Sequence, residues 1–337
     1  MRYMELSNHS MVKEFTLLGF PIAPCFPILF FAVFLTTYLL DLAENVIIIL
    51  TVWTNYNLHF PMYFFLSNLS FLEIWYVTVT LPKTMLSFVS VTKQISFMGC
   101  MTQLYFFLSL GNTECLLLAV TAYDHYVAIC NPFHYSTTIM RHTVCVYLTM
   151  GSWFTGFLIS GCKVFFISQL TYCGLNIINH FFCDVSPLLN LACTDMERAA
   201  LVDFMAALFI LLMLLSVVIL FYSCIIFTVL HISSVHSCQK AFYTCASHLI
   251  VVIVVYVTSI FIYGRPKKLP VHDTNKIVSA LCVVVVPLFN PIIYCLRNQE
   301  IKDALQKILN RIIYIKTDGA SPDSCKLCEY AAEMISP

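Results

Sequence analysis

The segment Cys115–Cys130 reads C-L-L-L-A-V-T-A-Y-D-H-Y-V-A-I-C, an apolar run that ends in charged and aromatic residues. Glu114 precedes it, and Asp124, His125 and Tyr126 stand near its end. An acid beside a cation at the end of an apolar span is costly in a membrane unless the pair is functional or lies at the interface. The triplet alone also fits plain interfacial residues on a membrane helix, so the rest of the chain is needed to interpret it.

The composition indicates a membrane protein. The chain has 337 residues, of which 60% are hydrophobic and 11% are charged. A soluble domain has about 45–50% apolar and about 25% charged residues. A shortage of charge over the whole length predicts several membrane spans. The formal net charge is zero, which suggests no nucleic-acid partner. We see no pattern of a cleaved signal peptide and expect the first apolar span to direct insertion.

Seven apolar segments follow one another along the chain. They lie near 26–52, 61–88, 98–130, 142–166, 200–230, 243–263 and 274–296. Each is long enough to cross about 30 Å of hydrocarbon as a helix, and unalternating runs of this length are helices rather than barrel strands. The links near 53–60, 131–141 and 231–241 are short. The predicted fold is all-α, a seven-transmembrane helix bundle whose termini lie on opposite sides of the membrane.

The two ends of the chain complete the predicted organisation. Residues 1–25 form a tail, 26–297 form the bundle, and 298–337 form a second tail. After Asn298, charged residues alternate with Ile301 and Leu305 at a spacing typical of a short amphipathic helix on the membrane surface. Residues 317–337 are small and polar, and their isolated Cys-x-x-Cys pair is too small a ligand set for tetrahedral zinc.

The orientation in the membrane follows from the cysteines and a glycosylation signal, because Lys and Arg are spread too evenly over the loops. Asn8 begins the acceptor tripeptide Asn-His-Ser, which is usable only outside the cytoplasm. Cys100 starts the third segment, and three more cysteines lie in the long loop 167–199. Disulfides would put this loop in an oxidising compartment. Four cysteines allow three connectivities, and the residues alone leave them open.

Several phrases, in order and at family spacing, resemble the olfactory receptors of the rhodopsin-like G-protein-coupled receptor family. They are E-F-T-L-L-G-F at 14–20, P-M-Y-F-F-L-S-N-L-S-F-L-E at 61–73, T-A-Y-D-H-Y-V-A-I-C-N-P-F-H-Y at 121–135, K-A-F-Y-T-C-A-S-H-L at 240–249 and P-L-F-N-P-I-I-Y at 287–294. The resemblance covers roughly residues 10–310. Three positions depart from the family pattern: His125 replaces Arg, Glu44 replaces a small Gly before Asn45, and Tyr243 replaces Ser.

The resemblance implies specific pairings and switch residues. It favours a Cys100–Cys183 disulfide with a second pair, Cys173–Cys193, and Cys100–Cys193 is the competing pairing. The residues that it implies for the G-protein switch are Asp124, His125, Tyr126, Tyr222, Asn290, Pro291 and Tyr294. Proline removes a helical hydrogen bond, so the seventh helix has a bend point within this set.

Two carboxylates, Glu73 and Glu114, lie deep inside apolar segments. Burial penalises the charged form, so they must be protonated, paired or bound to a cation. With Asn45 and Asn290, the resemblance implies a sodium pocket, and a carboxyl pair that shares a proton is the alternative. Glu44 could join this network. We expect no other cofactor.

The ligand site is expected between the helices, near the end that carries Cys100, in a mostly apolar pocket. By helical spacing and by resemblance, its candidate residues are Phe107, Leu108, Gly111, Asn112, Ala206, Ile210, Tyr256, Ser259, Ile260 and Tyr263. Packing or lipid-facing roles fit any one of them equally well. Ordinary apolar side chains of this kind do not identify the ligand.

The function that the resemblance implies is an odorant receptor in the plasma membrane, with its N-terminus outside. It would bind a small volatile or hydrophobic molecule and activate a stimulatory G protein, which raises cyclic AMP. His125 puts that coupling in doubt, so a non-coupling receptor is one alternative. A transporter or channel is less favoured because we see no inverted repeat of broken spans. No H-E-x-x-H or G-x-S-x-G motif points to an enzyme.

Overall fold

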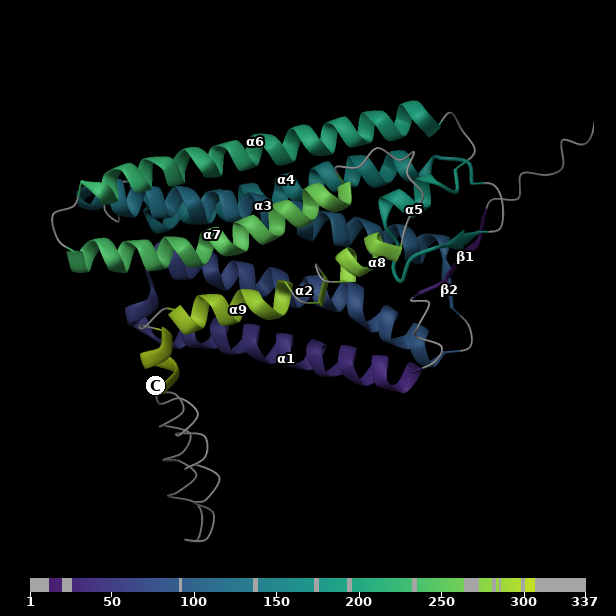
Figure 1. Ribbon diagram of the computed structural model, residues 1–337, viewed down its shortest axis with the longest axis horizontal. Helices are drawn as coiled ribbons and strands as arrows, with labels where there is room; N and C mark the ends of the chain where they lie inside the picture. Colours follow the sequence, from purple (N-terminus) through teal and green to yellow (C-terminus); the bar gives the residue numbers. More distant parts are fainter. Residues whose placement is uncertain are drawn as a thin grey trace, which may run out of the picture.

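A computed structural model shows the chain as an elongated bundle of helices that lie side by side (Figure 1). It describes residues 12–19, 26–90, 93–135, 139–172, 176–192, 196–231, 235–263, 273–280, 283–284, 286–297 and 301–306. The long helices are α1 (Pro27–Thr54), α2 (Pro61–Val89), α3 (Phe97–Cys130), α4 (His142–Ser168), α6 (Met196–Leu230) and α7 (Val235–Tyr263). The region of the seventh span contains α8 (Asp273–Ala280) and α9 (Val286–Arg297). The prediction of an all-α helical bundle is confirmed.

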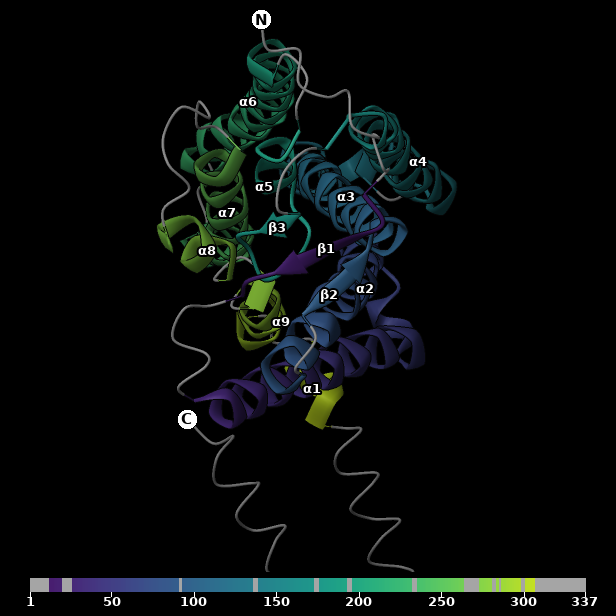
Figure 2. The same ribbon diagram turned by 90° about the vertical axis from the view of Figure 1, so that its right-hand side faces the viewer.

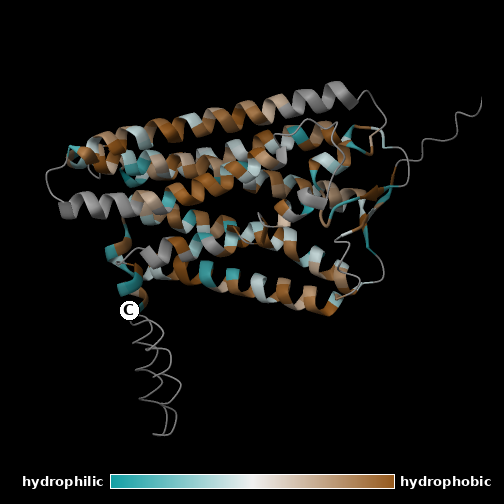
Figure 3. Cartoon of the chain, viewed as in Figure 1, coloured by the Kyte–Doolittle hydropathy of each residue, from teal (hydrophilic) through white to brown (hydrophobic). Residues whose placement is uncertain are grey.

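The long helices are built for a membrane. Within the described residues, five helices are long and apolar enough to cross one: α1, α2, α3, α4 and the part of α6 from Met205. Hydrophobic residues make up much of the length of the long helices (Figure 3). Large apolar side chains such as Ile28, Phe154 and Phe209 are exposed on the surface of the bundle. A water-soluble protein rarely exposes so large an apolar surface, whereas lipid tails would cover it.

One predicted boundary was wrong. Helix α7 begins at Val235, so the link after α6 is shorter than the predicted 231–241. The start of α7 is rich in Ser, His, Gln and Lys, which conceals the helix from a search for apolar runs. The other short links contain the single-turn helices η2 (Tyr56–Leu58) and η3 (Pro132–His134).

A small sheet lies across the end of the bundle that carries Cys100, and the sequence did not predict it (Figure 2). Strand β1 (Glu14–Leu17) lies between β2 (Gln94–Ser96), which it pairs with in antiparallel fashion, and β3 (Ile177–Ile178), which runs parallel to it. Phe15 and Leu17 of β1 are fully buried. Part of the segment predicted to be a tail is therefore packed onto the bundle.

Helix α3 is the centre of the bundle and contacts α2, α4, α6 and α7. Its packing against α4 is tight. A Cβ atom built on Gly156 would overlap the side-chain oxygen of Thr113 and would lie 3.1 Å from the backbone oxygen of Ser109. Nearby, Asn112 donates a hydrogen bond of 2.9 Å to Ser160. The absence of a side chain at Gly156 thus lets α4 lie directly on the backbone of α3.

Residues 301–306 are helical and lie at the opposite end of the bundle. Ile301 and Ala304 are buried in a cluster with Ile48 of α1, whereas Lys302 and Asp303 are exposed. This amphipathic pattern agrees with the predicted C-terminal helix over these residues. The rest of the predicted helix, and the Cys-x-x-Cys pair, lie outside the described residues.

Candidate functional site

A cavity of about 660 Å³ opens between α3, α4, α6 and α7, towards the end that carries Cys100. This volume is within the usual range for small-molecule pockets. Its lining is mostly apolar, with a few polar groups. The lining residues are Tyr76, Phe107, Leu108, Gly111, Asn112, Glu114, Cys115, Ile159, Lys163, Phe166, Ile167, Leu170, Leu189, Ala206, Ala207, Ile210, Leu211, Val255 and Ser259.

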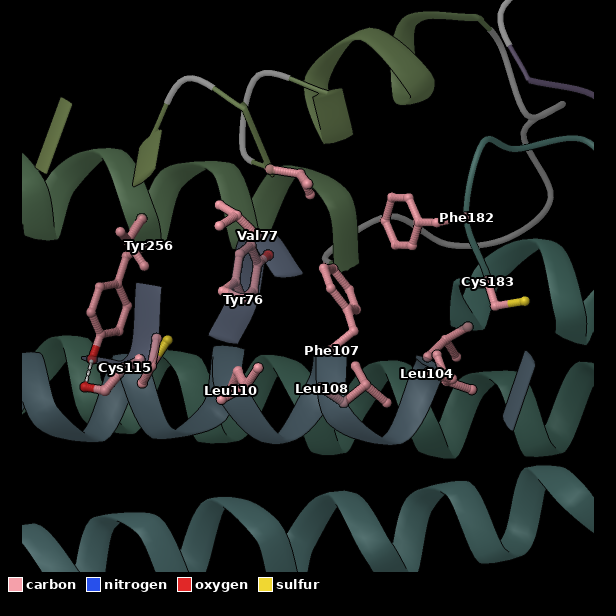
Figure 4. Packing of buried hydrophobic residues seen from close by; sticks show 14 of the residues in the cluster. Tyr76, Val77, Leu104, Phe107, Leu108, Leu110, Cys115, Phe182, Cys183 and Tyr256 are labelled. Carbon is pink, nitrogen blue, oxygen red and sulfur yellow. Dashed lines mark hydrogen bonds between the residues drawn. The ribbon is translucent and has the colours of Figure 1, made fainter. Parts of the chain in front are cut away.

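Most of the predicted ligand residues meet at this cavity. Those in its lining are Phe107, Leu108, Gly111, Asn112, Ala206, Ile210 and Ser259. Tyr256 and Ile260 are not among the described lining residues of this cavity, and their role in ligand binding stays a prediction. The buried Tyr256 hydroxyl instead donates a 3.1 Å hydrogen bond to the backbone oxygen of Cys115 (Figure 4). A buried hydroxyl needs such a partner, and this bond ties α7 to α3. The side chain of Tyr263 lies outside the described residues.

The sequence missed several lining residues. The most informative is Lys163, which lines the cavity from α4. An ionisable residue inside an apolar span is itself a signal for a functional site, and that signal could have identified Lys163. Glu114 also lines this cavity, although the sequence analysis assigned it to the sodium pocket. The remaining missed residues are mostly apolar and resemble their lipid-facing neighbours, so the sequence carries no comparable signal for them.

The Cys100–Cys183 disulfide, with its Cα atoms 5.5 Å apart, ties the start of α3 to the loop before the short helix α5 (Val185–Leu189). This prediction is confirmed, and the competing Cys100–Cys193 pairing is excluded. The side-chain oxygen of Gln103 accepts a 3.1 Å hydrogen bond from the backbone nitrogen of Cys183, and its nitrogen donates to the backbone oxygen of Val79. Cys173 lies outside the described residues, as does Cys193.

The loop held by this disulfide covers one end of the cavity. The ring of Phe182 lies 4.8 Å from that of Phe107, centroid to centroid (Figure 4). His180 is buried between Phe181 and Phe182, with ring centroids 4.6 Å from each. Burial, together with the nearby positive charge of Lys276, lowers the pKa of His180 to about 3. His180 is therefore neutral at physiological pH, and the cover is an apolar one.

A second cavity, of about 10 Å³, lies deeper in the bundle and has room for about one water-sized ligand. All four residues predicted for a sodium pocket line it, together with Ser70 and apolar neighbours. Asn290 donates a 2.6 Å hydrogen bond to Glu73. Glu114 lines both this polar cavity and the large one, so the two cavities share a wall. Within the described residues, no group of three or more His, Cys, Asp or Glu side chains is placed to hold a metal ion.

Asp41 is a polar residue of this region that the sequence analysis did not single out. It is fully buried on α1, and its carboxylate accepts a 3.1 Å hydrogen bond from Asn45. It is close enough to Glu73 and Glu44 for their charges to interact. The sequence signal that could have identified Asp41 is its position one helical turn before Asn45.

At the opposite end of α3, Asp124 accepts a 2.9 Å hydrogen bond from Tyr135. Burial raises the pKa of the Tyr135 hydroxyl, and the neighbouring Asp124 raises it further, so the hydroxyl stays protonated as the donor. The Nδ1 atom of His125 lies 3.9 Å from the other carboxylate oxygen of Asp124, which is beyond hydrogen-bond distance. Tyrosine, rather than His125, is thus the hydrogen-bond partner of Asp124.

His125 turns towards α6 and α7. Its ring packs edge-on against His248 with centroids 5.2 Å apart, and the Nδ1 atom of His248 is 2.6 Å from the Tyr222 hydroxyl. Tyr126 stacks on Phe221 of α6. These contacts join three helices at the end of the bundle opposite the disulfide. Of the other predicted switch residues, Asn290 and Pro291 line the polar cavity, and the side chain of Tyr294 lies outside the described residues.

Comparison with known proteins gives one consistent family. Residues 34–312 match the olfactory receptor family profile. Human olfactory receptor 6A2 is 60% identical over 308 residues, which cover 90% of this chain and 94% of the relative. Rat olfactory receptor 226 is 58% identical over 91% of this chain and 95% of the relative. Human olfactory receptor 6B1 is 54% identical over 90% of this chain and 97% of the relative.

Proposed function

The chain belongs to the olfactory receptor family and is a multi-pass membrane protein; from this we propose that it binds a small hydrophobic odorant in the 660 Å³ cavity and activates a stimulatory G protein, which raises cyclic AMP. We further propose that it lies in the plasma membrane with its N-terminus outside. The Cys100–Cys183 disulfide supports this orientation, because disulfides persist in oxidising compartments.

The single observation that carries the ligand proposal is the mostly apolar cavity between α3, α4, α6 and α7, at the end of the bundle that carries the disulfide. Apolar walls from four helices favour a hydrophobic ligand, since burial of apolar surface contributes about 25 cal/mol per Å². Asn112, Ser259 and Lys163 provide the polar contacts that would orient it. A ligand here touches α6 and α7, whose other ends make the contacts with His125, so binding and coupling involve the same helices.

The proposed coupling relies on an unusual switch. Arginine offers five donors in a fixed plane and keeps its charge, whereas histidine is shorter and titrates ordinarily near pH 6.5. At this end of the bundle, Tyr135 donates a hydrogen bond to Asp124, and the Tyr222 hydroxyl contacts His248, which packs against His125. Outward movement of α7 would break the second contact and expose His125 to the G protein. We expect this receptor to couple, with a lower maximal response than an arginine-containing switch would give.

The polar cavity is proposed to hold one sodium ion. Its donors are the carboxylates of Glu73 and Glu114, the amides of Asn45 and Asn290 and the hydroxyl of Ser70, all oxygen ligands suited to a hard cation. The confined volume suits a small monovalent ion better than calcium, which takes six to eight oxygen ligands. Bound sodium would compensate carboxylate charge in the apolar interior. A carboxyl pair that shares a proton is the competing arrangement.

The ligand proposal is tested by filling the cavity. A Cβ atom added to Gly111 meets no other atom within 4 Å, and Gly111 lines the cavity, so Gly111→Leu should fill the space without straining the helix. In cells that report cyclic AMP, an odorant panel should activate the wild type, and Gly111→Leu should reduce the potency of the active odorants at least tenfold. Gly151→Leu is the matched control, because Gly151 has equal space but lies on the exposed face of α4. Equal potencies for both variants at matched surface expression would refute this ligand site.

A further inference from the structure

The amide of Asn45 has only one orientation that satisfies its surroundings. Its nitrogen donates to the backbone oxygen of Asp41 at 3.0 Å and to the Asp41 carboxylate at 3.1 Å. An amide nitrogen has two hydrogens, so both are used. A rotated amide would place its oxygen against two other oxygens, which excludes the alternative assignment. The acceptors of Asp41 therefore fix which end of the Asn45 amide faces away from it.

The oxygen of the same amide is left without a partner. Asn45 is fully buried, and its Oδ1 atom has no hydrogen-bond partner among the described residues. A buried polar atom without a partner destabilises the folded state, so its retention calls for an explanation. Asn45 lines the polar cavity, where a cation would satisfy this oxygen. Asn290 also lines this cavity, and its nitrogen donates a hydrogen bond to Glu73.

We infer that Asp41 is a positioning residue for the sodium site, which it serves by holding the Asn45 amide so that its carbonyl oxygen is presented to the ion. The inference rests on the proposed sodium site and adds a residue to it. Asp41 itself does not line the cavity among the described residues, so it acts through Asn45. Partners that orient a metal ligand in this way typically change metal affinity by 10–100-fold when they are removed.

The test measures sodium binding through stability, without any odorant. The purified receptor is unfolded thermally in sodium chloride and in choline chloride at equal ionic strength. We expect the wild type to be stabilised by sodium and Glu73→Gln to lose this effect. Asp41→Leu should raise the sodium concentration for half-maximal stabilisation at least tenfold. Asp41→Asn retains an acceptor oxygen for Asn45 and should shift it much less. If Asp41→Leu cannot be purified in folded form, Asp41→Ala takes its place in this comparison.

The controls separate positioning from charge and from general damage. Glu44→Gln removes a neighbouring acid on α1 that interacts with Asp41 through its charge but has no hydrogen bond to Asn45 within the described residues. It should raise the sodium concentration for half-maximal stabilisation (the sodium midpoint) much less than Asp41→Leu does. A merely structural role for Asp41 would lower the melting temperature equally in both salts. Equal sodium midpoints for Asp41→Asn and Asp41→Leu would overturn the inference in favour of charge alone. A wild-type midpoint in Asp41→Leu would overturn it while the sodium site stands. No sodium effect in the wild type would remove the site itself, but not the odorant cavity.

Discussion

Replacing Gly156 with alanine should destabilise the receptor, although alanine is the better helix former. The added Cβ atom would overlap the Thr113 side chain and lie 2.9 Å from the Thr113 backbone nitrogen and 3.1 Å from the Ser109 oxygen. Two of these three atoms are backbone, so α4 as a whole has to move away from α3. Overpacking of this kind costs about 1–3 kcal/mol.

Helix propensity acts in the opposite direction to overpacking. Alanine in place of glycine stabilises a helix interior by up to about 1 kcal/mol. At Gly161 an added Cβ atom would lie 3.6 Å from Tyr105, which is an ordinary contact, so Gly161→Ala should be neutral or stabilising. The two variants are chemically identical changes in one helix. Their unfolding free energies should therefore differ by about 1–3 kcal/mol, with Gly156→Ala the less stable.

The assay is thermal unfolding of the purified receptor in the same detergent or lipid for both variants. Thr113→Ala in the Gly156→Ala background should recover part of the loss, because it removes the nearest atom but leaves the two backbone contacts. The displaced α4 would also strain the Asn112–Ser160 hydrogen bond beside the cavity, so odorant potency should fall in Gly156→Ala. If both glycine variants shift the melting temperature in the same direction and by the same amount, the argument from the close approach of α3 and α4 is refuted.

Two further predictions concern histidines. His125→Arg should raise the odorant-evoked maximum of cyclic AMP at equal surface expression, because arginine can pair with Asp124 and reach the G protein; an unchanged or smaller maximum would show that the switch tolerates histidine. For His180, whose pKa is lowered from 6.5 to about 3, the unfolded chain takes up a proton first as pH falls. The neutral His180 therefore contributes its full stabilisation of the folded receptor above about pH 6.5. This stabilisation is lost progressively as the pH falls towards 3, and about 2 kcal/mol of it is lost at pH 5. Between pH 7 and pH 5, the difference in unfolding free energy between wild type and His180→Gln, measured by thermal melting, should shrink by about that amount. If both proteins lose stability equally over this range, His180 is not the group that titrates.

The sequence alone determined the architecture, because the length and hydropathy of each span are local properties. Apolar runs long enough to cross a bilayer have only helices as a backbone solution. The quoted phrases then indicated the family, the disulfide and the unusual His125. Cys100 and Cys183 could be paired only through that resemblance, since their spacing is compatible with other connectivities. The start of α7 at Val235 escaped because polar residues at a helix end carry no hydropathy signal.

The tertiary structure alone decided which faces of these helices meet. A membrane helix is apolar on its lipid side and on its buried side, so periodicity does not fix its rotation about its axis. For this reason Tyr256, predicted for the cavity, instead bonds to the backbone of α3, and Lys163 was missed. The sheet of β1, β2 and β3 joins segments that are far apart in sequence, which no local pattern reveals. The role inferred for Asp41 likewise depends on hydrogen-bond directions at Asn45, and these exist only once α1 is packed against its neighbours.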